Sequence, residues 1–193
     1  MANVTVDDRF LAAVPTEARA TYEKRWRKLV NDHVDFTWRS LRRLGVLEAD
    51  LADAVQQVFL VLARKLDLVR EGCERGFLFQ TALRVASESR RSRTRRREVP
   101  EDVLESLPAE GPGPEEDLEA RLRRAQLDRI LDKMPIELRA VFVLSEIEEL
   151  TMAEIAVLMA IPPGTVASRL RRARVQFSEH VARLHKEESE GGT

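Results

Sequence analysis

Hydroxyl and guanidinium groups gather on one predicted helix near the end of the chain, running from about Pro163 toward Phe177. Their spacing aligns most of them along one line of the helix surface. Guanidinium forks and hydroxyls bind base edges and phosphate oxygens, and a helix that presents them outward has the form that enters a DNA major groove. A solvated amphipathic helix is the alternative. The candidate DNA-contacting residues are Thr165, Ser168, Arg169, Arg171, Arg172 and Arg174.

The opposite side of this helix is apolar. Its apolar residues recur at steps of four, three and four, which stacks them into one stripe that must pack against the rest of a domain. A helix seated by one face and polar on the other is therefore predicted. The stripe consists of Val166, Leu170, Ala173 and Phe177.

A short helix and a tight turn are predicted just before it. Thr151 followed by Glu154 is a capping box, and Leu150 lies where it can staple to Ile155, so a helix begins here. A turn follows at 160–162, and the fixed φ of a proline suits the first position of the next helix. Two short helices around a turn favour the DNA-contacting interpretation over a solvated surface helix.

This segment resembles the part of the bacterial extracytoplasmic function (ECF) sigma factors that reads the promoter −35 element. The family pattern is roughly (S/T)-x-x-E-I-A-x-x-L-x-x-P-x-G-T-V-x-S-R-L-x-R-A-R. Ala167 departs from it, since relatives often have Lys or Arg there, so a contact made at that position in relatives is in doubt here. The matching residues are Glu154, Ile155, Ala156, Pro162, Gly164, Thr165, Val166, Ser168, Arg169, Leu170, Arg172, Ala173 and Arg174.

An amphipathic helix is predicted over Asp50 to Leu66, capped by Asp50. Periodicity alone is typical of a plain core helix. The segment also resembles the family's D-A-E-D-L-V-Q-E-V-F helix, which docks on the clamp of the polymerase β′ subunit. Two family acids are replaced, so the docking face is less negative than usual. The apolar face consists of Leu51, Ala54, Val55, Val58, Leu62 and Leu66, and the polymerase-binding residues that the resemblance implies are Asp50, Asp53, Gln56, Gln57 and Phe59.

The stretch from Phe77 to Arg97 begins apolar and ends basic, with seven arginines and one acid between Arg84 and Arg97. Such a helix end would follow a phosphate backbone and make binding salt-sensitive, although a solvated tail is the alternative. It loosely resembles the family helix that reads the −10 element as single-stranded DNA. The candidate residues are Arg84, Arg90, Arg91, Arg93, Arg95, Arg96 and Arg97.

A loop is predicted from Val69 to Gly76, just before this helix. In relatives the loop at this place captures a flipped base of the −10 element. Phe77 and Phe79 stand next to it and could wall such a pocket, or they could be core residues.

The predicted fold is all-α, with two small helical domains joined by a flexible acidic linker and a helix-turn-helix in the C-terminal domain. The linker contains four prolines and two glycines, and nine acids and no base lie between Glu98 and Glu119. Its charge fits either solubility or mimicry of nucleic acid within the polymerase. Further helices are predicted at 22–44, 115–133 and 136–148. The predicted segments are a leader 1–21, domain 22–98, linker 99–114, domain 115–185 and disordered tail 186–193.

Composition narrows the function classes. With 44% hydrophobic and 34% charged residues and no long apolar run, the chain is predicted to be a cytoplasmic protein without a membrane segment. The single cysteine, Cys73, is assigned no role. No catalytic, metal-binding or cofactor motif is present, so an enzyme is not expected. A stand-alone helix-turn-helix transcriptional regulator is the alternative to a sigma factor. A protein–protein adaptor is a further alternative, but it would not need the arginine series.

The resemblance also implies partners. ECF sigma factors bind core RNA polymerase through its β′ clamp and β flap and direct promoter recognition and transcription initiation. The expected partners are therefore core polymerase and promoter DNA, and an anti-sigma factor is one that the resemblance leaves open. No cofactor is implied.

Overall fold

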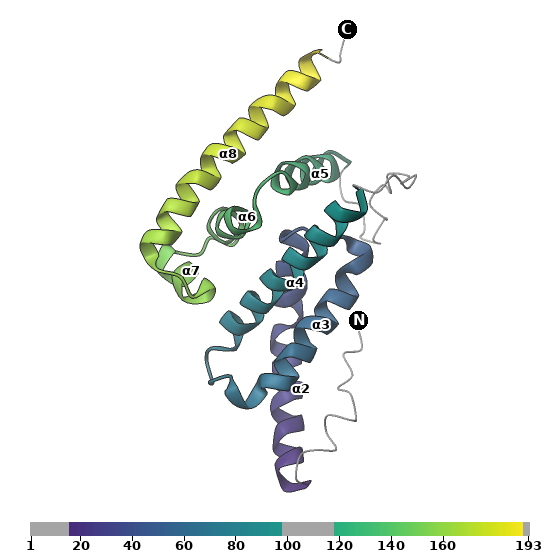
Figure 1. Ribbon diagram of the computed structural model, residues 1–193, viewed down its shortest axis with the longest axis vertical. Coiled ribbons are helices and arrows are strands. Elements are labelled where there is room, and N and C mark those ends of the chain that lie inside the picture. Colours follow the sequence, from purple (N-terminus) through teal and green to yellow (C-terminus); the bar gives the residue numbers. More distant parts are fainter. Residues whose placement is uncertain (1–15, 98–117, 191–193) are drawn as a thin grey trace. The chain divides into compact units, whose positions relative to one another are not determined.

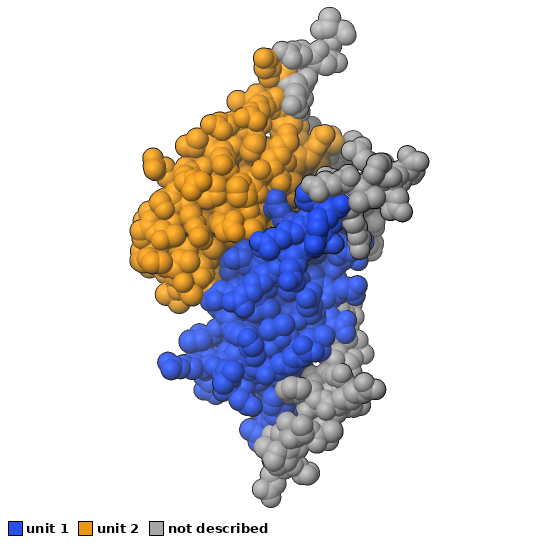
Figure 2. Space-filling view, viewed as in Figure 1, with its two compact units in different colours: residues 1–42, 46–101 blue, residues 43–45, 102–193 orange. Residues whose placement is uncertain are grey.

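The computed structural model describes residues 16–97 and 118–190, and every regular element in these two ranges is a helix (Figure 1). The predicted all-α class is confirmed. The described residues form two compact units, one of 16–42 with 46–97 and one of 43–45 with 118–190 (Figure 2). The predicted linker 99–114 lies outside the described residues, as do residues 1–15 and 191–193. None of the described helices is long and apolar enough to cross a membrane.

The first unit is built around α3. The α4 helix packs along it, and α2 completes the core through Trp26, whose ring meets the edge of Phe59 at a centroid distance of 5.9 Å. The predicted apolar face of α3 is buried throughout, as the helical period requires. The elements are α2 (Thr16–Arg43), α3 (Glu48–Lys65), the 3₁₀ turn η1 (Leu66–Leu68) and α4 (Glu74–Arg97).

The second unit is assembled on one long helix, α8. Helices α6 and α7 pack against it, and the rings of Phe142 and Phe177 stack at 4.6 Å where α6 meets α8. The core there also includes Leu131, Met134 and Ala173. The elements are α5 (Leu118–Asp132), α6 (Ile136–Phe142), the π-helical turn η2 (Val143–Ile147), α7 (Met152–Met159) and α8 (Pro163–Glu190).

Two helices are longer than predicted. The α2 helix already begins at Thr16, within the predicted leader, where the alanine-rich sequence favours helix. The α8 helix continues to Glu190 and takes in most of the predicted tail, because Val181 and Leu184 extend its half-buried stripe past Phe177.

Helix starts were predicted less well than helix faces. Leu47, with extended backbone and no side-chain cap, precedes α3, so Asp50 lies in the first turn and is not the cap. In the first turn of α3 the Asp50 carboxylate still complements the helix dipole.

The α4 helix begins at Glu74, which shortens the predicted loop to 69–73. The predicted helix 136–148 is α6 followed by η2.

Candidate nucleic-acid interface

The turn between α7 and α8 has the geometry that the sequence predicts. The backbone N–H of Thr151 donates to Glu154 Oε2 at 2.8 Å, and the N–H of Glu154 donates to Thr151 Oγ1 at 3.3 Å, which completes the capping box. Ala160 ends α7 in the left-handed conformation, with φ 51°. The N–H of Thr165 then bonds the carbonyl of Pro162 at 2.9 Å as α8 begins. These contacts fix the direction in which α8 leaves the turn.

The α8 helix is seated by the predicted stripe. Val166 and Ala173 are fully buried, Leu170 is 6% exposed, and Phe177 stacks on Phe142. Because the buried stripe occupies one side, the residues offset from it by half a turn must face outward. The polar line of α8 is therefore presented away from the core.

The six candidate residues on α8 are not equally exposed. Ser168, Arg171, Arg172 and Arg174 are exposed, whereas Thr165 and Arg169 are half-buried. The Ser168 hydroxyl donates to the carbonyl of Thr165 at 3.0 Å, so it reaches a base only by giving up or sharing this bond. Arg172 is the candidate arginine that lies on the line and is exposed.

Two residues at this face were missed from the sequence. Glu146, in η2, accepts hydrogen bonds from Nε and Nη2 of Arg174 at 3.1 and 2.8 Å. Val175 is 54% exposed and lies two turns beyond Ser168 on the same line of α8. The helical period of α8 was the signal that could have indicated Val175. No local signal in the sequence indicates the contact of Glu146 with Arg174, because these residues are 28 positions apart.

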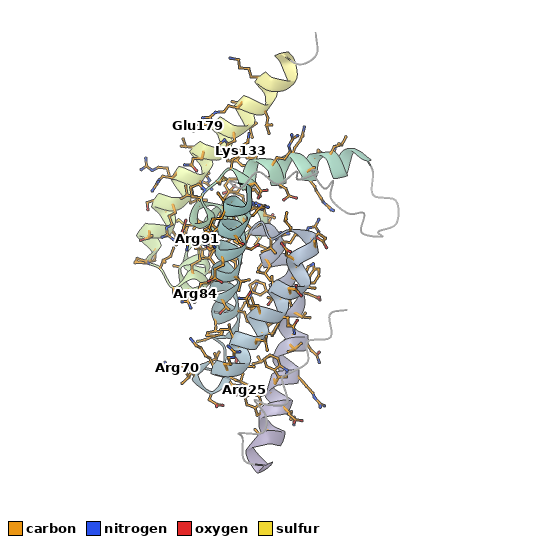
Figure 3. The ribbon with its side chains drawn as sticks, turned by 45° about the vertical axis from the view of Figure 1, so that its right-hand side comes forward. Arg25, Arg70, Arg84, Arg91, Lys133 and Glu179 are labelled. Carbon is orange, nitrogen blue, oxygen red and sulfur yellow. The ribbon has the colours of Figure 1, made fainter. Side chains whose placement is uncertain are left out.

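The arginines of α4 divide into two groups. Arg84, Arg91 and Arg95 are exposed, and their spacing of seven and four residues puts them on one outer face. Figure 3 labels Arg84 and Arg91 along this helix. Arg90 and Arg93 are half-buried and engaged in contacts within the protein, so their guanidinium groups are less available to DNA than those of the exposed arginines. Nothing is described for the side chains of Arg96 and Arg97. Glu88, also exposed, lies on the same line between Arg84 and Arg91, and Arg95 lies where α4 faces α3. Arg84 and Arg91 are therefore the cations of this face that are best placed for a phosphate backbone.

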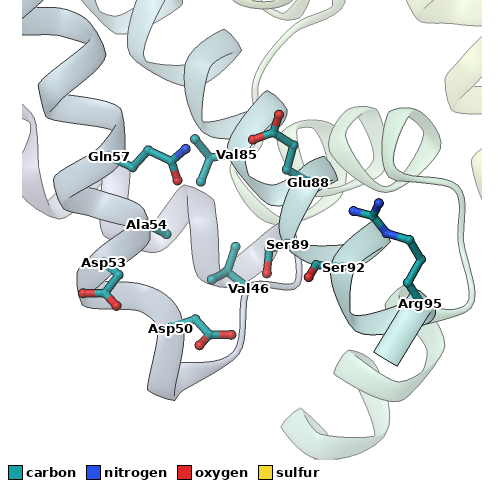
Figure 4. Close-up of a pocket in the computed structure, with 10 residues that line it drawn as sticks. All are labelled: Val46, Asp50, Asp53, Ala54, Gln57, Val85, Glu88, Ser89, Ser92 and Arg95. Carbon is teal, nitrogen blue, oxygen red and sulfur yellow. The ribbon is translucent and has the colours of Figure 1, made fainter. Parts of the chain in front are cut away.

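A groove lies between α3 and α4 (Figure 4), with a volume of about 430 Å³. One wall carries Asp50, Asp53 and Gln57, three of the predicted polymerase-binding residues. The facing wall from α4 adds Glu88 and Arg95, and the serines Ser89 and Ser92 lie between them. Three carboxylates against one guanidinium make the groove predominantly acidic. The α4 contribution was missed, because the sequence does not tell which face of α4 meets α3.

Two further predicted polymerase-binding residues differ from this pattern. Gln56 is exposed but does not line the groove. Phe59 is fully buried against Trp26, so its assignment as a polymerase contact is corrected to a core role. The physical reason is that both α2 and α4 pack against α3. Together they bury Phe59 in addition to the predicted apolar face of this helix.

Residues 124–177 match the model of the family "Sigma-70, region 4", which takes in α6, α7 and the first half of α8. The ECF RNA polymerase sigma-E factor of Escherichia coli is 30% identical over 150 residues, covering 72% of this chain and 78% of that protein. The chain belongs to the ECF sigma factors. Another relative, the ECF RNA polymerase sigma factor SigE of Mycolicibacterium smegmatis, is 34% identical over 160 residues. The match covers 82% of this chain but only 62% of the length of SigE.

Solved structures place this ECF sigma factor in the same fold. CnrH, in complex with the cytosolic domain of CnrY, has a TM-score of 0.57 at 21% identity and covers 94% of this chain and 98% of its own. The sigma factor RpoE of Bartonella quintana, in complex with the anti-sigma factor NepR, has a TM-score of 0.61 at 18% identity, with 82% and 98% coverage. At these identities the likeness is one of fold.

Proposed function

We propose that this ECF sigma factor binds core RNA polymerase in the cytoplasm and directs it to promoters, at which transcription then starts. The observation that carries the proposal is the outward face of α8. A helix fixed by a capped neighbour and a tight turn, and seated by an apolar stripe, offers Arg171 and Arg172 to an approaching duplex. In this proposal α7 and α8 form a helix-turn-helix that reads the −35 element.

The first unit would bind the −10 element as an opened strand. The outer face of α4, with Arg84 and Arg91, supplies cations along the path of a phosphate backbone. The loop 69–73 lies at the N-terminal end of the same helix, where it would meet the bases of that strand. Family membership supports this assignment over a stand-alone regulator, which would need a dimer to span two half-sites.

The groove between α3 and α4 is proposed as part of the surface that docks on the β′ clamp. Its carboxylates Asp50, Asp53 and Glu88 suit a partner segment that carries basic side chains. The β flap is proposed to bind the second unit.

We further propose that the chain has two domains, 22–98 and 115–185, joined by the flexible linker 99–114. Limited proteolysis should therefore cut first within 99–114 and leave two helical fragments.

An anti-sigma factor is proposed as a regulating partner. The support is that two sigma factors of similar fold, CnrH and the RpoE of Bartonella quintana, form complexes with CnrY and the anti-sigma factor NepR. A surface blocked by such a partner could not bind polymerase at the same time. A genetic neighbour that co-purifies with this chain and prevents core binding would be that regulator.

The docking proposal is tested by measuring the affinity of the full chain for purified core polymerase. Asp53→Arg should weaken core binding by on the order of tenfold or more, because it places a cation at an acidic interface. Asp35→Arg is the matched control, since Asp35 is an exposed carboxylate on α2 that does not line the groove. Equal losses in both variants would reject the groove as the docking surface, and absence of binding by the wild-type chain would reject the proposed function.

A further inference from the structure

The loop 69–73 between η1 and α4 is anchored at its start and open at its tip. Val69 is 6% exposed, whereas Arg70, Glu71 and Cys73 are exposed. Gly72 has a φ of +83°, and a Cβ built on it would meet nothing within 4 Å. A loop with a buried base and a tip in open space can present its backbone to a ligand, provided that its ends are held.

One side chain from α2 holds both ends of this loop. Arg25 Nη2 donates to the carbonyl oxygen of Val69 at 2.5 Å, across 44 positions of the chain. The same nitrogen lies 4.0 Å from Glu74 Oε1, in the first residue of α4. The guanidinium therefore connects the buried residue at the start of the loop to the first helical residue after it. Figure 3 shows Arg25 and Arg70 at the same end of the unit.

The surroundings make this contact more than a surface ion pair. The side chains of Arg25 and Glu74 are only 30% and 12% exposed. Tyr22, one turn earlier on α2, donates its hydroxyl proton to the carbonyl of Ala63 near the end of α3, at 2.6 Å. Two consecutive turns of α2 thus donate hydrogen bonds to backbone carbonyls of the segment that leads into the loop. The bond from Arg25 is the stronger of the two, because its donor is charged.

We infer that Arg25, together with Glu74, is a positioning residue that fixes the loop 69–73 for recognition of the −10 element. The inference rests on the proposed function, in which that loop meets the bases of the opened strand. Arg25 acts through the loop and touches no DNA itself. Its loss should leave the fold and polymerase docking in place and should loosen only the loop, whose local stability is separable from that of the helices.

The test compares Arg25→Met, Arg25→Lys and the control Arg27→Met in the full chain bound to core polymerase. Arg27 is also a cation on α2, but its ion pair with Glu23 is local and its side chain is 78% exposed. Binding is measured to forked promoter DNA with an intact or a scrambled −10 element, and the ratio of the two affinities is the readout. Affinity for core polymerase, −35 preference and thermal stability are measured in parallel.

Arg25→Met should lower this ratio by on the order of tenfold, the effect of losing one charged hydrogen bond to the loop, while core affinity and −35 preference stay unchanged. Arg25→Lys should recover part of the ratio, since it keeps the charge beside Glu74 and one donor. Arg27→Met should match the wild type. An unchanged ratio in Arg25→Met, even with lower thermal stability, would overturn the positioning role. A wild-type chain that binds core polymerase and DNA without any −10 preference would instead show that the proposed function of the loop is wrong.

Discussion

Arg174 of α8 donates two hydrogen bonds to a single oxygen of Glu146, in the π-helical turn that follows α6. Arg174 was predicted from the sequence as a DNA contact. In the structure its guanidinium is already engaged by this carboxylate. Glu146 and a DNA phosphate would therefore compete for the same cation.

Glu146→Gln should strengthen binding to all promoters alike and steepen the dependence of log affinity on log salt by about one unit, since Arg174 is then available to a phosphate. The measurement is the salt dependence of promoter binding by the polymerase complex. Glu137→Gln, which removes another exposed carboxylate of the same unit, is the control. If Arg174→Ala already lowers the salt slope by about one unit in the wild-type background, Glu146 does not hold Arg174 back and this account of the pair is wrong.

Arg172 should be the residue of α8 whose loss changes sequence preference most. A bidentate contact from its exposed guanidinium to a base contributes about 1–3 kcal/mol of discrimination, so Arg172→Ala should relax preference at particular −35 positions. Selection from promoters with a randomised −35 element measures this. Arg183→Ala, an exposed cation further along α8, should leave the preference unchanged. Lower affinity of Arg172→Ala without a change in preference would mean that Arg172 contacts only the backbone.

Ala160 bears a backbone strain that glycine would relieve. Its left-handed conformation at the end of α7 is costly for a residue with a Cβ, so Ala160→Gly should stabilise the second unit by about 1 kcal/mol. Urea unfolding followed by far-ultraviolet circular dichroism gives the free energy. Ala182→Gly, within α8, should destabilise by a similar amount. A loss of stability in Ala160→Gly would show that the turn does not require this conformation.

The second unit should lose stability as the pH falls below neutrality. Burial lowers the pKa of His180, and the nearby charges of Arg183 and Lys133 lower it further, against an opposing effect of Glu179. Figure 3 labels Lys133 and Glu179. Among the described residues, its Nδ1 has no hydrogen-bond partner. Since the folded state binds the proton more weakly than the unfolded state, stability is full above about pH 6.5 and declines as the pH falls from there toward the lower folded pKa.

Urea unfolding at a series of pH values, followed by circular dichroism, tests this dependence. His180→Gln should flatten the decline below about pH 6.5, whereas His33→Gln, in the first unit, should leave it unchanged. A decline that is as steep in His180→Gln as in the wild type would assign the pH dependence to other groups.

Local signals predicted the elements that carry the candidate site. The capping box of Thr151 and Glu154, the turn before Pro163 and the stripe of Val166, Leu170 and Ala173 depend on residues within a few turns of one another, and all are confirmed. The same holds for the apolar face of α3. Periodicity fixes which side of a helix is buried, because that relation is internal to the helix.

Relations between helices could not be predicted in this way. The burial of Phe59 depends on Trp26 from α2, and the entry of Ser89 and Ser92 into the groove depends on the face that α4 turns to α3. The pairing of Arg174 with Glu146 and the hold of Arg25 on Val69 join residues far apart in the chain. Each depends on how helices pack together, which the residue pattern of a single helix does not specify.

Transcription in vitro tests the central claim most directly. Purified core polymerase with the full chain is given a genomic DNA library, and the transcripts are sequenced from their 5′ ends. The account predicts start sites that share one −10 and one −35 sequence, that are absent with core polymerase alone, and that shift in −35 sequence with Arg172→Ala. Start sites no different from those of core polymerase alone, although the chain is folded and binds DNA, would contradict the assignment of a promoter-directing sigma factor.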